Sequence, residues 1–261
     1  MIGSKKDKKA ILIEKSPSKI GIYNVEEDQL ICSNHYQSKT FATDPINISN
    51  IESSDSKYRY SRTKELLSKK IQFDPNDVAT ILRNQKGLNE DTLGMGNPKA
   101  INQLIAHHSV IIQPEDLIFY ISTTDYQLGK FIGYKLDEIF NADKNNIDNS
   151  LFIEEDPFIR SKKYSLFNDF NNMKNIISRY LNFDDQLDLN NDEINYFINS
   201  NKESYVSYEM IARYFIKKNK PSYAEQYIDL ALTKNLASKD VKKEFKALQK
   251  IINLSRSNSR N

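Results

Sequence analysis

The chain has 261 residues, of which 39% are hydrophobic and 28% are charged, so it can form one large domain or two ordinary ones with packed cores. Its formal net charge is only +2, which gives no global field to attract nucleic acid or an anionic membrane. One cysteine excludes an internal disulfide, and three histidines leave few ligands for a metal, so no metal, cofactor or nucleic-acid partner is expected.

The N-terminal stretch MIGSKKDKKA is basic and predicts an unstructured start that contains Ser4. The apolar run after it extends only from Ala10 to Ile13, too short for the core of a signal peptide. No other run approaches the roughly 18 apolar residues of a membrane span. The expectation is a cytoplasmic protein with no membrane partner.

Three segments near the N-terminus, AILIE, KIGIYN and QLICSNHY, are rich in β-branched and aromatic residues and predict strands. Pro17 and Ser18 separate the first two, which predicts a hairpin. In the third segment, strand alternation places Cys32 on one face of the sheet and His35 on the other. We therefore expect Cys32 to be a small buried residue, not the nucleophile of a Cys–His dyad.

The next segments predict helices followed by a second hairpin. Residues 40–56 are polar and predict a surface loop, and YRYSRTKELLSKK after them predicts a helix. FDPNDVATILRN predicts a helix with Asp74 as N-cap and Pro75 at its first position, and GNPKAINQLIAHH repeats this pattern with Asn97 and Pro98. SVIIQPEDLIFYIS predicts the hairpin. Strands, then helices, then strands favour an α+β fold for residues 1–140.

Several charged residues and glycines in this region have two interpretations each. Arg59 and Arg62, three apart on a predicted helix, can share a face, or they are surface or carboxylate-paired arginines. His107 and His108 end the predicted third helix, where a cation favours the dipole, and one of them is a candidate core histidine. The glycines of GLNEDTLGMGNPK match no phosphate-binding spacing, so this stretch predicts a loop near a pocket.

Composition changes at residues 141–150, NADKNNIDNS, which predict a linker to an all-helical extension at 151–261. Residues 205–238 have the pattern of one tetratricopeptide-like repeat, with a generic helical hairpin as the alternative. A single repeat cannot bury its faces alone, so it must pack on other elements. The sequence after Ser238 predicts a solvated, lysine-rich face and a frayed tail. The packing positions of the repeat are Tyr208, Ile211, Ala212, Phe215, Ala224, Ile228 and Ala231.

Three stretches of the chain together resemble one family: ILIEKSPSKIGIYN to QLICSNHYQS, SKYRYSRTKEL, and AINQLIAHHSVII to ISTTDYQLGKFIGY. They resemble the acyl-CoA:6-aminopenicillanate acyltransferase-like group of N-terminal nucleophile (Ntn) hydrolases, over about residues 10–140. The resemblance implies a four-layer αββα sandwich and an N-terminal cysteine, exposed by self-cleavage, whose α-amino group is the general base. It implies a linear amide or an acyl-thioester such as acyl-CoA as substrate.

The same resemblance implies that Asn34 donates its side-chain N–H to the oxyanion of the reacting acyl group. Capping of the following turn is the alternative role for Asn34. Arg59 and Arg62 become candidates for substrate binding. No nucleophile is found, because MIGSKKDKKA contains no cysteine and cleavage before Cys32 would separate the matched strands from the sheet.

The leading hypothesis is therefore the carboxyl-terminal part of an Ntn-type acyltransferase or amidohydrolase, inactive alone, whose partner is the missing N-terminal half. Such a part would expose a raw sheet face. The alternative is a non-catalytic binding module whose helical tail recruits a protein partner. A thiol enzyme that uses Cys32 and His35 is the third hypothesis, and strand alternation argues against it.

Overall fold

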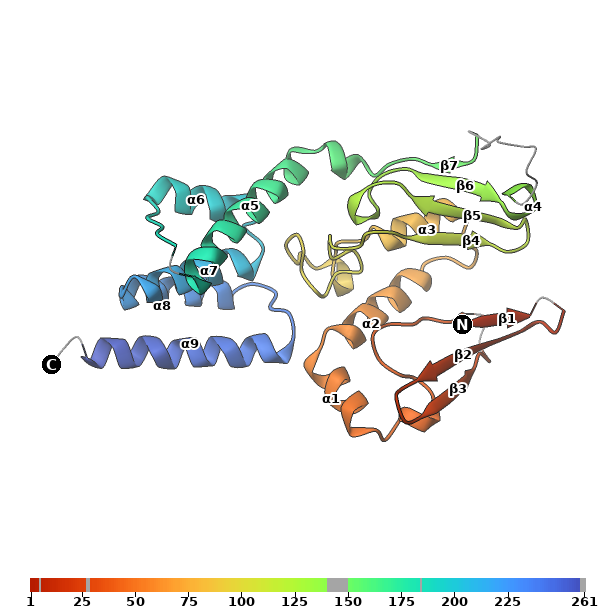
Figure 1. Ribbon diagram of the computed structural model, residues 1–261, viewed down its shortest axis with the longest axis horizontal. Coiled ribbons are helices and arrows are strands. Elements are labelled where there is room, and N and C mark those ends of the chain that lie inside the picture. The colour runs from red at the N-terminus through yellow and green to blue at the C-terminus, as the bar shows by residue number, and fades with distance from the viewer. Residues whose placement is uncertain (5, 27–28, 140–149, 184, 259–261) are drawn as a thin grey trace.

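The structure is a computed structural model that describes residues 1–4, 6–26, 29–139, 150–183 and 185–258 (Figure 1). These residues form an α+β protein with two separate antiparallel sheets, of three and four strands, followed by a group of helices. Each sheet contains only strands that are consecutive in the chain. This order gives no sign of the two stacked sheets of an αββα sandwich. No helix in the described part of the chain is long and apolar enough to cross a membrane.

The first sheet confirms the predicted hairpin and adds a strand to it. β2 (Lys9–Lys15) and β3 (Ile20–Asn24) pair with Ile13 opposite Ile22. β1 (Ile2–Ser4) pairs with β2, so the prediction of an unstructured start was wrong. Of the lysines that suggested disorder, Lys6 and Lys8 lie in the turn between β1 and β2, and Lys9 starts β2.

The third predicted strand was also wrong, because residues 29–36 run as irregular chain. Side chains bind the backbone that a sheet ladder would otherwise have paired. Asn47 accepts from the backbone N–H of Tyr36 at 2.9 Å and donates to its carbonyl at 3.1 Å, and Asn50 donates to the carbonyl of Asn34 at 2.5 Å. The segment is thus held by single asparagines of the next helix.

That helix, α1 (Pro45–Ser53), lies in the stretch predicted as a loop. Asp44 caps it by accepting hydrogen bonds from the backbone N–H groups of Ile46 and Asn47, and Pro45 stands at its first position. α2 (Ser56–Leu67) and α3 (Pro75–Leu82) confirm the next two predicted helices. Asp74 and Asp77 form a capping box at the start of α3.

The third predicted helix, residues 98–108, does not form. Asn97 accepts from the N–H of Lys99 and Asn102 accepts from that of Leu104, so each asparagine closes a turn that no helix continues. Leu104 has a left-handed backbone with φ 52°, which a helix does not allow. The prediction that Asn97 and Pro98 start a helix was wrong, because the side chain of Asn97 closes a turn and caps no helix.

The second sheet has the order β4-β5-β6-β7, and its first two strands are the predicted hairpin. Helix α3 contacts β4 and β7, and the core of this part comprises Ala79, Ile111, Tyr120, Phe131 and Ile153. The predicted linker lies outside the described residues except for Ser150, and strand β7 follows it, where only helices were predicted. The strands are β4 (Val110–Gln113), β5 (Ile118–Ser122), β6 (Phe131–Lys135) and β7 (Phe152–Ile153), and the short helix α4 (Leu136–Ile139) directly follows β6.

The helical unit that follows has the larger apolar core, and every packing position predicted for the repeat is buried in it. Ala212, Ala224 and Ala231 have no exposed surface, which lets the two helices of the hairpin approach closely. The helices are α5 (Lys162–Asn182), α6 (Asn191–Ser200), α7 (Tyr205–Lys217), α8 (Pro221–Leu232) and α9 (Lys239–Asn258), and short 3-10 helices lie at Lys39–Phe41, Leu88–Glu90, Asp125–Gln127 and Pro157–Arg160.

Asparagines join the helical unit to the loop between α3 and β4. Asn201 accepts from the backbone N–H of Met95 at 3.0 Å and donates to its carbonyl at 2.8 Å. Asn97 donates to the carbonyl of Asn235, and Asn235 donates to that of Thr92, each at 2.9 Å. The two parts of the chain therefore share a specific polar interface.

Candidate functional site

The segment of highest interest, Cys32–Gln37, lines a pocket of about 790 Å³. The other walls are the second half of β2, the turn between β2 and β3, Phe41 and the start of α1. Asn34, Cys32 and His35 all border this pocket. The three residues of this segment that were considered as site residues from the sequence therefore line one pocket.

Glu14 holds the end of this segment in place. Its side chain is buried on β2, and its carboxylate accepts hydrogen bonds from the backbone N–H groups of Gln37 at 2.7 Å and Ser38 at 2.8 Å. Gln37 in turn donates from its side chain to the carbonyl of Ile31 at 2.7 Å. A buried carboxylate with two N–H donors is well satisfied, so Glu14 positions the loop and is not a free base.

Asn34 and Arg59 are brought together by the fold. Arg59 donates to the side-chain oxygen of Asn34 at 2.6 Å and to the carbonyl of Pro98 at 2.7 Å. Because a guanidinium can only donate, it fixes the amide of Asn34 with the oxygen towards Arg59 and the NH₂ group on the opposite side. Asn34 is exposed and borders the pocket, so its N–H groups can serve a ligand there.

Cys32 is exposed, so the prediction of a buried packing residue was wrong. The reason is that the segment is not a strand, so the alternation of faces does not apply. Partial burial of the thiol, with a smaller effect of the Glu14 charge, raises the pKa of Cys32 above its ordinary value. The thiol is therefore protonated at neutral pH and is not activated for nucleophilic attack.

His35 is engaged with serines. Its Nδ1 lies 2.7 Å from the hydroxyl of Ser56, which donates to the hydroxyl of Ser33 at 3.0 Å. Burial lowers the pKa of His35, so the imidazole is neutral at neutral pH. A protonated thiol and a neutral imidazole form no ion pair.

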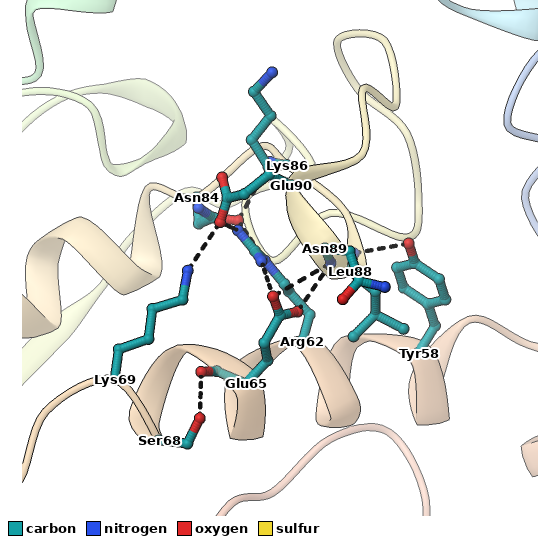
Figure 2. A network of polar contacts seen from close by, with 10 residues as sticks. All are labelled: Tyr58, Arg62, Glu65, Ser68, Lys69, Asn84, Lys86, Leu88, Asn89 and Glu90. Atoms are coloured by element: carbon teal, nitrogen blue, oxygen red, sulfur yellow. Dashed lines mark hydrogen bonds and ion pairs between the residues drawn. The ribbon is translucent and has the colours of Figure 1, made fainter.

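Arg62 lies in a different network, buried between α2 and the loop after α3 (Figure 2). It donates to Asn84 at 3.2 Å and to Glu90 at 2.8 Å, and Lys69 also pairs with Glu90 at 3.0 Å. The third guanidinium nitrogen, Nη1, is 3.0 Å from the carboxylate of Glu65 but is not aligned to donate to it. Arg62 is thus a carboxylate-paired arginine that does not border the pocket of Asn34.

The loop held by Arg62 has unusual backbone geometry. Asn89 and Glu90 are both left-handed, with φ 54° and 63°, and the N–H of Asn89 donates to Glu65 (Figure 2). Further along, Gly94 has φ 78°, and a Cβ there would lie 2.6 Å from the backbone nitrogen of Ser204. The predicted glycine loop is confirmed, and Gly94 is required where it approaches the helical unit.

The remaining candidates stand apart from this pocket. His107 and His108 are exposed and lie in irregular chain, so the expectation of a core histidine at the end of a helix was wrong. Ser4 ends β1 and donates to Asp7 at 2.6 Å. Among the described residues, no group of histidine, cysteine and carboxylate side chains could hold a metal ion.

Glu14 and Asn47 are the site residues that sequence reasoning missed. Both are buried polar residues that bind backbone groups of the pocket segment. The signal for Glu14 was a lone carboxylate inside an apolar strand, and for Asn47 it was the Asp-Pro pair before it, which is the same helix-start pattern as at Asp74 and Pro75.

Comparisons of this chain with protein-family models, with curated proteins and with solved structures found no match. Function is therefore inferred from the geometry of the site and from the resemblance in the sequence.

Proposed function

We propose that this chain is the carboxyl-terminal part of an Ntn-type acyltransferase or amidohydrolase that acts on linear amides or acyl-thioesters such as acyl-CoA. A partner polypeptide supplies the nucleophile and its α-amino base, and the chain alone is inactive. The observation that carries the proposal is an uncovered apolar face on the four-stranded sheet, opposite the face covered by α3.

Two rows of apolar side chains cross that uncovered face. Directly paired residues of neighbouring strands point to the same side of a sheet. Val110 pairs with Ile121, Ile121 with Ile132, and Ile132 with Phe152 in one row, while Ile112, Phe119 and Tyr134 form the next. The exposed fractions of Val110, Ile112 and Phe152 are 53%, 68% and 40%.

A sheet that is apolar on both faces is typical of an inner layer, with helices on one side and a second sheet on the other. Here Ile111, Tyr120 and Phe131 fill the face towards α3. The opposite face lacks a layer of its own among the described residues. This supports a partner that covers it, as the second sheet does in an αββα sandwich.

The contact between Asn34 and Arg59 supports a role for Asn34 as a donor to the oxyanion. Arg59 turns the amide N–H groups of Asn34 away from itself, which is the orientation that an oxyanion-hole donor requires. Loss of one such donor typically lowers the rate about 100- to 1000-fold. Arg59 is a positioning residue in this scheme, while Arg62 maintains the neighbouring loop.

Activity assays of the purified chain test the catalytic part of the proposal. We expect no release of acyl groups from linear amides or acyl-thioesters, because the Cys32 thiol is protonated and the chain has no other cysteine. Hydrolysis that persists in Cys32→Ala contradicts the proposal. Hydrolysis that disappears in Cys32→Ala also contradicts it, and supports the thiol-enzyme hypothesis.

The uncovered face is tested by sizing and by binding of a hydrophobic dye. We expect the wild-type chain to self-associate and bind the dye, and Ile112→Lys to reduce both without loss of helical circular dichroism. Ile71→Lys is the matched control, because Ile71 is 97% exposed and lies in the loop between α2 and α3, outside the sheet strands. A monomeric chain without dye binding contradicts the proposal.

A non-catalytic binding module is the second candidate, and an open groove in the helical unit favours it. The groove has a volume of about 460 Å³ and lies between α5, α7 and α9, with Met210, Leu248 and Ile251 on its walls. In this candidate α7 and α8 form a tetratricopeptide-like repeat that presents the groove to a protein partner. It predicts a monodisperse chain with a single thermal transition, which the sizing experiment distinguishes.

A further inference from the structure

A second pocket, of about 420 Å³, lies where the middle of α5 meets the loop before β4. Its walls also include Tyr126 and the start of α7, so it sits between the sheet part and the helical unit. None of its lining residues borders the pocket of Asn34. Its volume lies within the range of about 300–1,000 Å³ that is typical of small-molecule sites.

Lys174 is the one charged side chain among the described residues that line this pocket. It is half-buried, and no described carboxylate pairs with it. Its ammonium lies 5.6 Å from the centroid of the Phe170 ring, and burial lowers its pKa. A partly desolvated charge without a counter-ion is unfavourable, and a bound anion would remove that penalty.

Side-chain amides lie on the same walls as Lys174. Asn171 and Asn175 are on α5 at spacings of three and one from Lys174, and Gln103 comes from the facing loop. Residues 171, 174 and 175 share one face of the helix. No hydrogen bond joins these three amides to another described side chain or backbone group, so their donors are free for a ligand.

Aromatic side chains also line the pocket: Phe167 and Phe170 lie on α5 with Lys174, and Tyr126 comes from the segment between β5 and β6. Tyr126 meets Phe167 edge-on at 6.2 Å between ring centroids, and Phe167 stacks with Phe170 at 6.3 Å. Tyr126 has a left-handed backbone, with φ 61°, which is unfavourable for a bulky residue. Its N–H donates to the carbonyl of Ala106, and its carbonyl accepts from Asn102, so two hydrogen bonds hold this ring at the pocket.

We propose that this pocket binds a small organic monoanion, a carboxylate attached to an aromatic or aliphatic body. The carboxylate lies at Lys174 and the amides of α5, and the body lies against Phe167, Phe170 and Tyr126. A single positive charge favours one negative charge, and the aromatic wall favours an apolar body over a small inorganic ion. The proposal is independent of the function proposed for the Asn34 pocket.

Calorimetry and thermal shift of the full chain test this proposal with benzoate, hexanoate, benzamide and inorganic phosphate at constant ionic strength. We expect both carboxylates to bind and to raise the melting temperature with concentration. Benzamide has the same body without the charge, so we expect it to bind at least about tenfold more weakly, as loss of a charge-assisted hydrogen bond implies.

The variants separate the charge from the rest of the pocket. Lys174→Met should weaken benzoate binding about 10- to 100-fold, Lys174→Arg should retain most of it, and Lys163→Met, an exposed lysine of the same helix, should not change it. If Lys174→Met does not fold, Asn175→Leu gives the second measurement, with a weaker loss. Equal affinity for benzoate and benzamide, tighter binding of phosphate, unchanged binding by Lys174→Met, or no binding of either carboxylate overturns the proposal.

Discussion

The helical unit and the part of the chain before it are held together by different interactions. In α5–α9, apolar side chains form one continuous buried core, in which Phe197, Ile211 and Ile228 have no exposed surface. Before residue 140, the cluster between α3 and the second sheet is small, and buried polar side chains fix long irregular segments. The stability of the first region should therefore depend on volume, and that of the second on individual hydrogen bonds.

Arg83 illustrates how the second region works. It donates to the carbonyl of Gln127 at 2.9 Å and to that of Gly129 at 2.7 Å, and its guanidinium lies 5.1 Å from the centroid of the Phe131 ring. One side chain thus ties α3 to the turn that precedes β6. Glu14, Asn47 and Arg62 act in the same way at other loops. Each binds atoms that are distant from it in sequence.

The largest effect is expected from truncation in the helical core. Phe197 is fully buried and stacks on Phe170 at 5.1 Å, so Phe197→Ala should lower the free energy of unfolding by about 3–5 kcal/mol. Urea denaturation followed by circular dichroism measures this change. Asn195→Ala, exposed on the same helix, should stay within about 0.5 kcal/mol of wild type. A cost near that of the control would show that the core does not hold this region.

Substitution of Arg62 should have a smaller but local effect. Arg62→Met keeps much of the volume and loses the bonds to Asn84 and Glu90, for a loss of about 2–3 kcal/mol. The carboxylates of Glu65 and Glu90 are partly exposed and can regain water, which limits the loss. Limited proteolysis should show faster cleavage in the loop at residues 84–90.

The control for this experiment is Arg62→Lys, which keeps the charge without the planar fork and should recover only part of the stability. If Arg62→Met is as stable and as protease-resistant as wild type, the region before residue 140 does not depend on individual hydrogen bonds, and the contrast with the helical unit fails.

Glu14 allows a test of the pocket segment itself. Glu14→Gln can accept from only one of the two N–H groups well, so we expect a loss of about 1–2 kcal/mol. The Glu14 charge also raises the pKa of Cys32, so its removal should increase the rate at which the thiol reacts with a disulfide reagent at pH 7. The exposed Glu52→Gln is the matched control. A slower or unchanged rate would contradict the assigned role of Glu14.

The same contrast explains which elements could be predicted from the sequence. The α7–α8 hairpin, the capped helix at Asp74 and both β-hairpins depend on contacts close in sequence, and their patterns were sufficient. The segment around Cys32 and the loop after Asn97 depend on asparagine and glutamate side chains that bind distant backbone. The periodic spacing of apolar residues carries no information about such bonds. A strand and a helix were therefore predicted where neither forms.

For the candidate site, the pairing of Asn34 with Arg59 could not be seen in the sequence either, because the two residues are 25 positions apart on different elements. For Arg59 and Arg62, a shared helix face and surface or carboxylate-paired roles were both left open. The structure places the two arginines in separate networks, and Arg62 is the carboxylate-paired one. Lys174 had no signal of its own, since a lysine on an amphipathic helix is ordinarily exposed.

The smallest effect is expected from titration of the Arg62 network. The ion pairs with Arg62 and Lys69 lower the pKa of Glu90 from 4.5 to about 2. Because this pKa is lower in the folded than in the unfolded chain, its contribution to stability is complete above pH 4.5 and is lost as the pH falls from 4.5 towards 2. Glu90 is 57% exposed, so solvent screening keeps this contribution small. The melting temperatures of wild type and Glu90→Gln should therefore differ at pH 6 and converge near pH 2.5. A difference that is constant with pH would mean that Glu90 acts by packing and not by charge, which would make this loop resemble the helical core.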